Sequence, residues 1–115
     1  MKFTVDTQYL LDCFRRLVNT PSPVGYYPLL NPVLEAEAAA FGYGITYDNR
    51  GTPYIILDGQ DNSKTVMIGA HVDTIGLVVR AVERNGMLRV RPLGGVNFAS
   101  MEGETVTVHT RDGRS

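Results

Sequence analysis

The feature that most constrains the fold is the stretch from Thr65 to Val79, TVMIGAHVDTIGLVV, in which two apolar runs enclose one His and one Asp. A continuous apolar run predicts a strand that is covered on both faces, as at the centre of a parallel sheet. Burying an imidazole or a carboxylate costs free energy unless the group is paired. The stretch therefore predicts a central strand over residues 65–70 that positions two polar side chains at its end.

His71 and Asp73 are two residues apart, so in an extended chain they point to the same side while Val72 faces the other way. Open α/β sheets bind ligands at the carboxyl ends of their strands. A neutral imidazole is a good zinc ligand, and a neighbouring carboxylate holds the ring and raises its basicity. The pair is also compatible with a plain hydrogen bond, and two residues cannot complete a zinc site of about four ligands.

Other candidate ligands are weaker. His109 lies in an alternating segment, which predicts an exposed position on a strand. Glu102 and Glu104 lie at a loop and a strand start and are interpreted as solvated charges. Cys13 is the only cysteine, which excludes an intrachain disulfide or a cysteine-rich zinc site, and its helical surroundings predict a small buried side chain.

Two helices are predicted in the first third of the chain. The first covers residues 7–19, with Asp6 as N-cap and an apolar stripe at helical spacing made of Leu10, Leu11, Phe14, Leu17 and Val18. The second begins at Asn31 as N-cap, with Pro32 at the first helical position and Gly42 as C-cap. Its predicted inner face comprises Val33, Leu34, Ala38 and Phe41.

Strands dominate the remainder. Residues 44–48 and 52–58 predict a hairpin around the turn 49–51, and a polar loop follows at 58–64. A second hairpin is predicted from 75–83 and 87–93, followed by a glycine turn at 94–95 and a loop to residue 100. Residues 104–110 predict a last strand leading into a tight turn at 111–114. Helices followed by strands favour an α/β layer joined to a separate β unit.

Composition narrows the function classes. The 115 residues suit one small domain or a piece of a larger protein, and 43% hydrophobic with 20% charged residues is ordinary for a globular protein. A net charge of −1 gives no reason to expect nucleic acid or an anionic membrane as a partner. No apolar run approaches the roughly 20 residues of a membrane span, and no signal peptide is evident, which favours the cytoplasm. The turn at 111–114 has no return strand, so we hypothesise a fragment.

The order and spacing of three segments carry a family resemblance. IGAHVDTIGLVV, NGMLRVRPLGGV and EGETVTVHTRDG together resemble the M42 metallo-aminopeptidases, a family of glutamyl and deblocking aminopeptidases that build tetrahedral particles. The segments NTPSPVGYY and YDNRGTPYIILDG extend the resemblance over nearly the whole chain. The His-x-Asp triplet alone is shared with related zinc peptidases, so the later Gly-Gly and Glu-Gly-x-x-Val segments make the match specific.

The resemblance implies a fold and a reaction. Residues 1–73 would form the N-terminal part of a zinc-peptidase-like α/β catalytic domain, and residues 74–115 would lead into an inserted β-rich dimerisation domain. The family removes N-terminal residues from peptides with two divalent metal ions, commonly zinc or cobalt, and assembles dimers into a dodecamer. His71 matches its first metal ligand, and Asp73 matches the carboxylate that orients the imidazole and supports catalysis.

The resemblance also marks departures and alternatives. The bridging Asp, the general-base Glu and the remaining ligands of the family follow the inserted domain, so the 115 residues alone are expected to be inactive and to expose apolar surface. Thr74 stands where the family frequently has Glu, which suggests a subgroup with another substrate preference. Two alternatives stay open: a non-catalytic truncated relative acting as an assembly or binding module, and a related two-metal amidohydrolase or glucanase.

Overall fold

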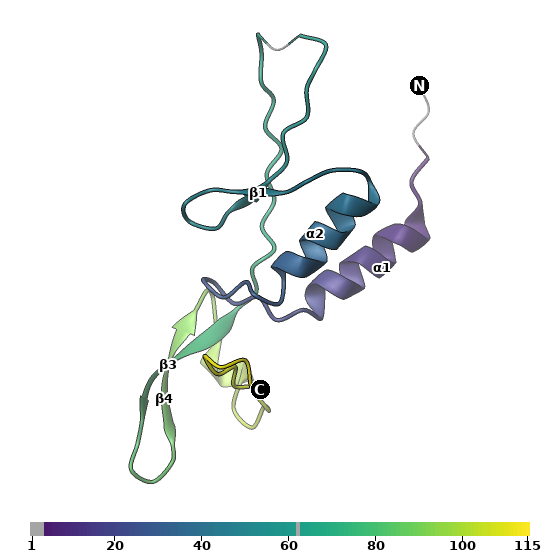
Figure 1. The fold of residues 1–115 in the computed structure, drawn as a ribbon. Helices are drawn as coiled ribbons and strands as arrows, with labels where there is room; N and C mark the ends of the chain where they lie inside the picture. Colours follow the sequence, from purple (N-terminus) through teal and green to yellow (C-terminus); the bar gives the residue numbers. More distant parts are fainter. Residues whose placement is uncertain (1–3, 62) are drawn as a thin grey trace.

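The computed structural model describes residues 4–61 and 63–115, and it contains two helices, two short hairpins and long extended segments between them (Figure 1). Helix α1 spans Thr7–Val18 and α2 spans Asn31–Ala40; strands β1 and β2 span Thr46–Tyr47 and Pro53–Tyr54; β3 and β4 span Gly76–Val82 and Leu88–Leu93. A 3-10 helix, η1, covers Phe98–Ser100. In the part of the chain that the structure describes, neither helix has the length and hydrophobicity of a membrane span. Residues 1–3, and residue 62 of the predicted polar loop, lie outside the described residues.

Helix α1 confirms its sequence prediction closely. The Asp6 carboxylate accepts a hydrogen bond from the Tyr9 backbone N–H at 2.9 Å, which satisfies one of the free donors of the first turn. The helix ends at Asn19, before the Pro-Ser-Pro segment that cannot continue it. The predicted apolar stripe is not covered, however, because α1 has no buried residue and Phe14 is 59% exposed. The prediction that Cys13 is buried is also wrong, since the thiol is only half-buried.

Helix α2 differs from its prediction at both ends by one residue. Leu30, not Asn31, is the N-cap and gives no side-chain hydrogen bond, while Pro32 lies in the first turn as expected. At the other end Phe41 is the C-cap, and Gly42 follows it with φ of +78°, a left-handed conformation that glycine adopts most easily. The predicted inner face is confirmed for Ala38, which is buried. It is wrong for Phe41, which is 60% exposed.

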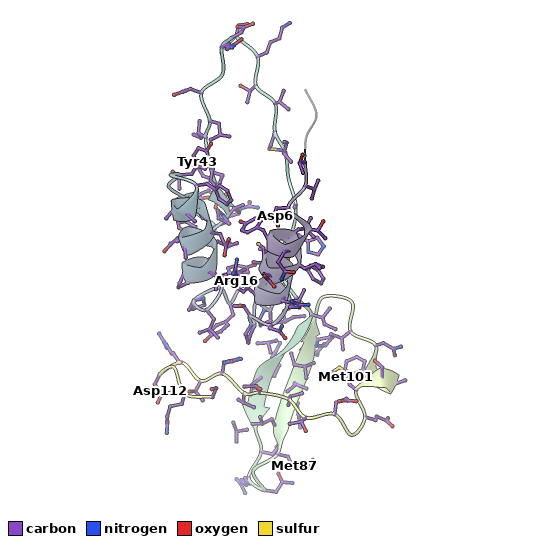
Figure 2. All side chains as sticks on the ribbon, turned by 90° about the vertical axis from the view of Figure 1, so that its right-hand side faces the viewer. Asp6, Arg16, Tyr43, Met87, Met101 and Asp112 are labelled. Carbon is purple, nitrogen blue, oxygen red and sulfur yellow. The ribbon has the colours of Figure 1, made fainter. Side chains whose placement is uncertain are left out.

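The two helices lie side by side and run in opposite directions, with Asp6 and Tyr43 at the same end of the pair (Figure 2). Polar contacts join them: the Tyr9 hydroxyl donates to Glu37 Oε2 at 2.9 Å, and Arg16 forms an ion pair with the same carboxylate. The Tyr9 ring also meets the Phe41 ring edge-on at 5.6 Å. Exposed ion pairs add little stability, so these contacts orient the helices more than they hold them together.

The hairpin of β1 and β2 forms where it was predicted but is much shorter. Only Thr46↔Tyr54 and Tyr47↔Pro53 pair across it. The Asp48 carboxylate closes the turn by accepting from the backbone N–H groups of Arg50 and Thr52, each at 2.8 Å. These bonds, chiefly that from Thr52, hold the pKa of Asp48 below its usual value.

The Tyr47 hydroxyl donates to Glu35 Oε1 at 2.7 Å and so joins β1 to α2. Partial burial and this hydrogen bond raise the pKa of Tyr47 to about 12. Because the folded state holds the phenol proton more tightly, the stabilisation is present below the usual tyrosine pKa of about 10 and is lost as pH rises through 12.

Tyr47→Phe should lower the free energy of unfolding of the whole protein by about 1 kcal/mol at neutral pH. Urea unfolding at a series of pH values measures the effect, and the difference in stability between the two proteins should shrink as the pH rises from about 10 to about 12. Tyr43→Phe, at an exposed tyrosine, is the control. An equal loss of stability in that variant would contradict the role of the Tyr47 hydrogen bond.

The hairpin of β3 and β4 is confirmed and is the longest ladder of the described chain. It pairs Gly76↔Leu93 through Val82↔Leu88, with one irregularity between Val79 and Ala81. The glycine turn after it is also confirmed, since Gly94 has φ of +76°. The loop that follows contains η1, whose first turn is capped by the Asn97 side chain.

Two predicted strands do not form. Residues 65–70 were expected to be a covered central strand, but no strand of the described chain pairs with them, and Val66, Met67 and Ile68 are 84%, 90% and 94% exposed. They belong to an extended arm that projects from the rest of the molecule (Figure 1). Residues 104–110 also lack strand pairing, although the turn after them closes through the Thr110 N–H bond to the Arg114 carbonyl at 2.8 Å. A strand forms only where a neighbouring strand accepts and donates its backbone hydrogen bonds, and no described segment pairs in this way with residues 65–70 or 104–110.

Little of the chain is buried. Leu30 and Ala38 are the buried apolar residues of the described chain and Ser22 the buried polar one. The accessible surface is 10208 Å², against about 6,200 Å² for a compact protein of this 12.7 kDa mass. The radius of gyration is 18.4 Å, against about 13 Å for a compact chain of this length. The α/β character is confirmed at the level of mixed helices and strands, and the sheets that the described residues form are two separate two-stranded ones.

Candidate metal centre

The two side chains predicted to act together do lie together. His71 Nδ1 is 3.4 Å from Asp73 Oδ1, and Val72 between them is half-buried. The separation suits an ion pair and is longer than a well-formed N–H···O hydrogen bond. The His71 side chain is 86% exposed and that of Asp73 is 38% exposed. A carboxylate on the Nδ1 side leaves Nε2 as the atom available to a ligand.

The segment between these residues is attached to the loop after α1, which lies about fifty residues earlier in the sequence. The Ser22 hydroxyl donates to the Val72 carbonyl at 3.0 Å, and the Thr74 N–H donates to the Ser22 carbonyl at 2.9 Å. Pro23 and Thr74 form a parallel bridge beside these bonds. The Pro-Ser-Pro segment was predicted to end a helix and to carry part of the family resemblance, but no local pattern indicates its distant partner.

Gly76 permits the closest contact at this junction. A Cβ placed on Gly76 would lie 2.6 Å from Pro23 Cβ, a separation that real side chains do not adopt. Gly76→Ala should therefore displace β3 or the Pro23 loop and cost about 1–3 kcal/mol of stability, as overpacking does. Urea unfolding of the whole protein measures this. Gly95→Ala, where an added Cβ meets nothing within 4 Å, is the matched control, and equal effects of the two substitutions would contradict the packing argument.

A depression of roughly 280 Å³ lies beside the His71–Asp73 pair. Its wall comes from the loop before α2 and the first turns of that helix, from the β1–β2 turn, and from residues 70–73; it includes Tyr27, Leu30, Leu34 and Arg50. A larger hollow at the tip of the β3–β4 hairpin is lined by Glu83, Arg84, Asn85, Met87, Leu88 and Arg89, and it contains neither member of the pair. Of these two hollows, the smaller one is lined by the His71–Asp73 pair.

His109 differs from its prediction. It is half-buried, and its ring stacks on Tyr26 at a centroid distance of 5.5 Å and an interplanar angle of 24°. The reason is that residues 104–110 fold back toward the loop after α1 instead of forming an exposed strand. Glu102 and Glu104 are exposed, as predicted.

The donor set fits one part of a metal centre. Among residues 4–61 and 63–115, no group of three or more His, Cys, Asp or Glu side chains gathers to hold a metal ion. One imidazole with a carboxylate on its Nδ1 side matches a single metal ligand and the group that orients it.

Comparison with known proteins identifies the family. Residues 51–115 match the family model of the M42 glutamyl aminopeptidases, and the chain belongs to this family. The chain is 30% identical over 105 residues to YhfE of Bacillus subtilis (strain 168), a protein named as an aminopeptidase, with 90% of this chain and 30% of that protein covered. It is 28% identical over 106 residues to the glutamyl aminopeptidase of Lactococcus lactis subsp. cremoris (strain MG1363), covering 91% of this chain and 30% of the relative.

A third relative matches a shorter segment. The lysyl aminopeptidase of Pyrococcus furiosus is 34% identical over 59 residues, covering 51% of this chain and 17% of that protein. No solved structure matches this chain. The chain spans about 30% of the length of the first two relatives.

Proposed function

We propose that the protein carrying this chain is a metallo-aminopeptidase that removes N-terminal residues from peptides at a centre of two divalent metal ions, zinc or cobalt. The observation that carries the proposal is the His71–Asp73 pair, 3.4 Å apart, within a segment that matches the M42 family model over residues 51–115. The aminopeptidase names of the relatives support the same reaction.

The proposed roles follow from the donor atoms. His71 supplies one metal ligand through Nε2, and Asp73 fixes the orientation of the ring from the Nδ1 side. A bound divalent metal would supply Lewis acidity toward the peptide carbonyl. We place the remaining ligands and the general base in other parts of the protein, as the family resemblance implies; the described residues bring together no group of three or more metal-ligating side chains.

The proposed architecture divides the chain at the site. Residues 1–73 form part of the catalytic domain, and residues 74–115 begin the β-rich dimerisation domain through which dimers assemble into a dodecamer in the cytoplasm. The β3–β4 hairpin lies apart from the two helices, which supports this division (Figure 1). Intact mass together with light scattering of the natural protein tests the assembly, and a monomer would contradict it.

The test of activity uses the full natural protein and a panel of aminoacyl p-nitroanilides and short peptides, each with a free or an acetylated N-terminus. Residues should be released one at a time from the N-terminus, chelation should abolish cleavage, and zinc or cobalt should restore it. Cleavage of glucans or of non-peptide amides instead of peptides would favour the glucanase or amidohydrolase alternative. A protein that binds no divalent metal would favour the non-catalytic binding module.

A further inference from the structure

The geometry points to Ser22 as a positioning residue for the metal centre, a role that rests on the function proposed above. Ser22 is fully buried, with 0% of its surface exposed, in a chain that buries very little. Its hydroxyl donates to the carbonyl of Val72, the one residue between His71 and Asp73. No other side-chain hydrogen bond of the described chain ends on the backbone of residues 71–73.

Ser22 contacts this segment on two sides. The side chain donates to Val72, and the main-chain carbonyl accepts from the Thr74 N–H at 2.9 Å. The two bonds fix the peptide units that flank Asp73, and the direction of a side chain follows from the dihedrals of its backbone. Asp73 must point to the same side as His71 to orient its ring, and these two bonds set the backbone direction from which the Asp73 side chain projects.

The alternative is that Ser22 only packs the junction. Its neighbours argue against packing alone, because Pro23 against Gly76 already closes the junction and the main-chain bond to Thr74 does not need a hydroxyl. The hydroxyl adds one specific contact, to the carbonyl between the two site residues. Groups that orient a metal ligand typically change metal affinity 10–100-fold when removed.

The experiment measures zinc affinity of the full natural protein by competition with a chromophoric chelator, together with kcat and KM for a cleaved peptide. Ser22→Ala removes the hydroxyl, and Ser22→Cys keeps a side chain of similar size with only a weak S–H donor. Both should weaken zinc binding about 10-fold or more and lower kcat with little change in KM. Hydrogen exchange at the Asp73 and Thr74 amides should quicken in the metal-free variants.

Ser100→Ala is the matched control, because that hydroxyl also bonds a backbone carbonyl, Asn97 at 2.9 Å, but within a turn remote from the pair. It should leave zinc affinity unchanged. If Ser22→Ala lowers only the melting temperature while zinc affinity and kcat match the parent, or if Ser22→Cys binds zinc normally, the positioning role is overturned. If the parent protein itself binds neither zinc nor cobalt, the proposed function fails and the positioning role fails with it.

Discussion

Replacing His71 by alanine should abolish peptide cleavage by the full protein and weaken zinc binding by more than about 100-fold, because removal of even an outer partner of a ligand costs 10–100-fold. The imidazole is 86% exposed and the part of the chain that the structure describes shows no other contact for it besides Asp73, so little stability depends on it. The variant should therefore fold normally while losing metal. Elemental analysis of the purified protein and chelator competition measure the loss directly.

His109→Ala is the control for this substitution. It removes the other histidine of the chain, which stacks on Tyr26 and does not touch the pair. It should retain metal and activity and lose only a modest amount of stability. Full metal content in the His71 variant, or equal losses in both variants, would contradict the assignment of His71 as a ligand.

The second large effect concerns the apolar arm formed by residues 65–70. In the full protein Ile68→Ala should cost about 2–5 kcal/mol, the usual range for a buried Ile or Leu. In the isolated 115-residue chain, where Ile68 is 94% exposed, the same change should fall within about ±0.5 kcal/mol. The isolated chain should also associate or precipitate, because an exposed apolar patch of this kind marks an interface, and it should not cleave peptides.

The stability of a Met67→Ala variant shows whether one face of the arm or both faces are buried in the full protein. Neighbouring residues of an extended chain point to opposite faces, so Val66 and Ile68 share one face and Met67 takes the other. A central strand loses stability at both Met67 and Ile68, whereas a strand with one solvated face loses it at one only. Urea unfolding of the two alanine variants makes the comparison, and small effects of both in the full protein would contradict a covered strand.

Local sequence determined the helices, the turns and the adjacency of the pair. Asp6 caps α1, the prolines end it, and the β3–β4 hairpin forms around its predicted turn, because each of these depends on residues within a few positions. Alternation alone placed His71 and Asp73 on one side of an extended chain, and the structure brings them within 3.4 Å. The family resemblance drawn from the same residues is confirmed by the M42 match.

Only the tertiary structure decided which residues hold that pair in place and which expected strands form. Ser22 and Val72 meet across 50 positions, and the stacking of His109 on Tyr26 spans a longer interval still. Hydrophobic periodicity does not predict such contacts, because they join residues that are far apart in the sequence and meet only in the folded chain. Residues 65–70 have the composition of a central strand. A strand forms only when neighbouring strands satisfy its backbone hydrogen bonds, and the composition of one segment does not determine whether such neighbours are present. The sequence by itself determined the chemistry that His71 and Asp73 can perform, and the tertiary structure decided what orients them.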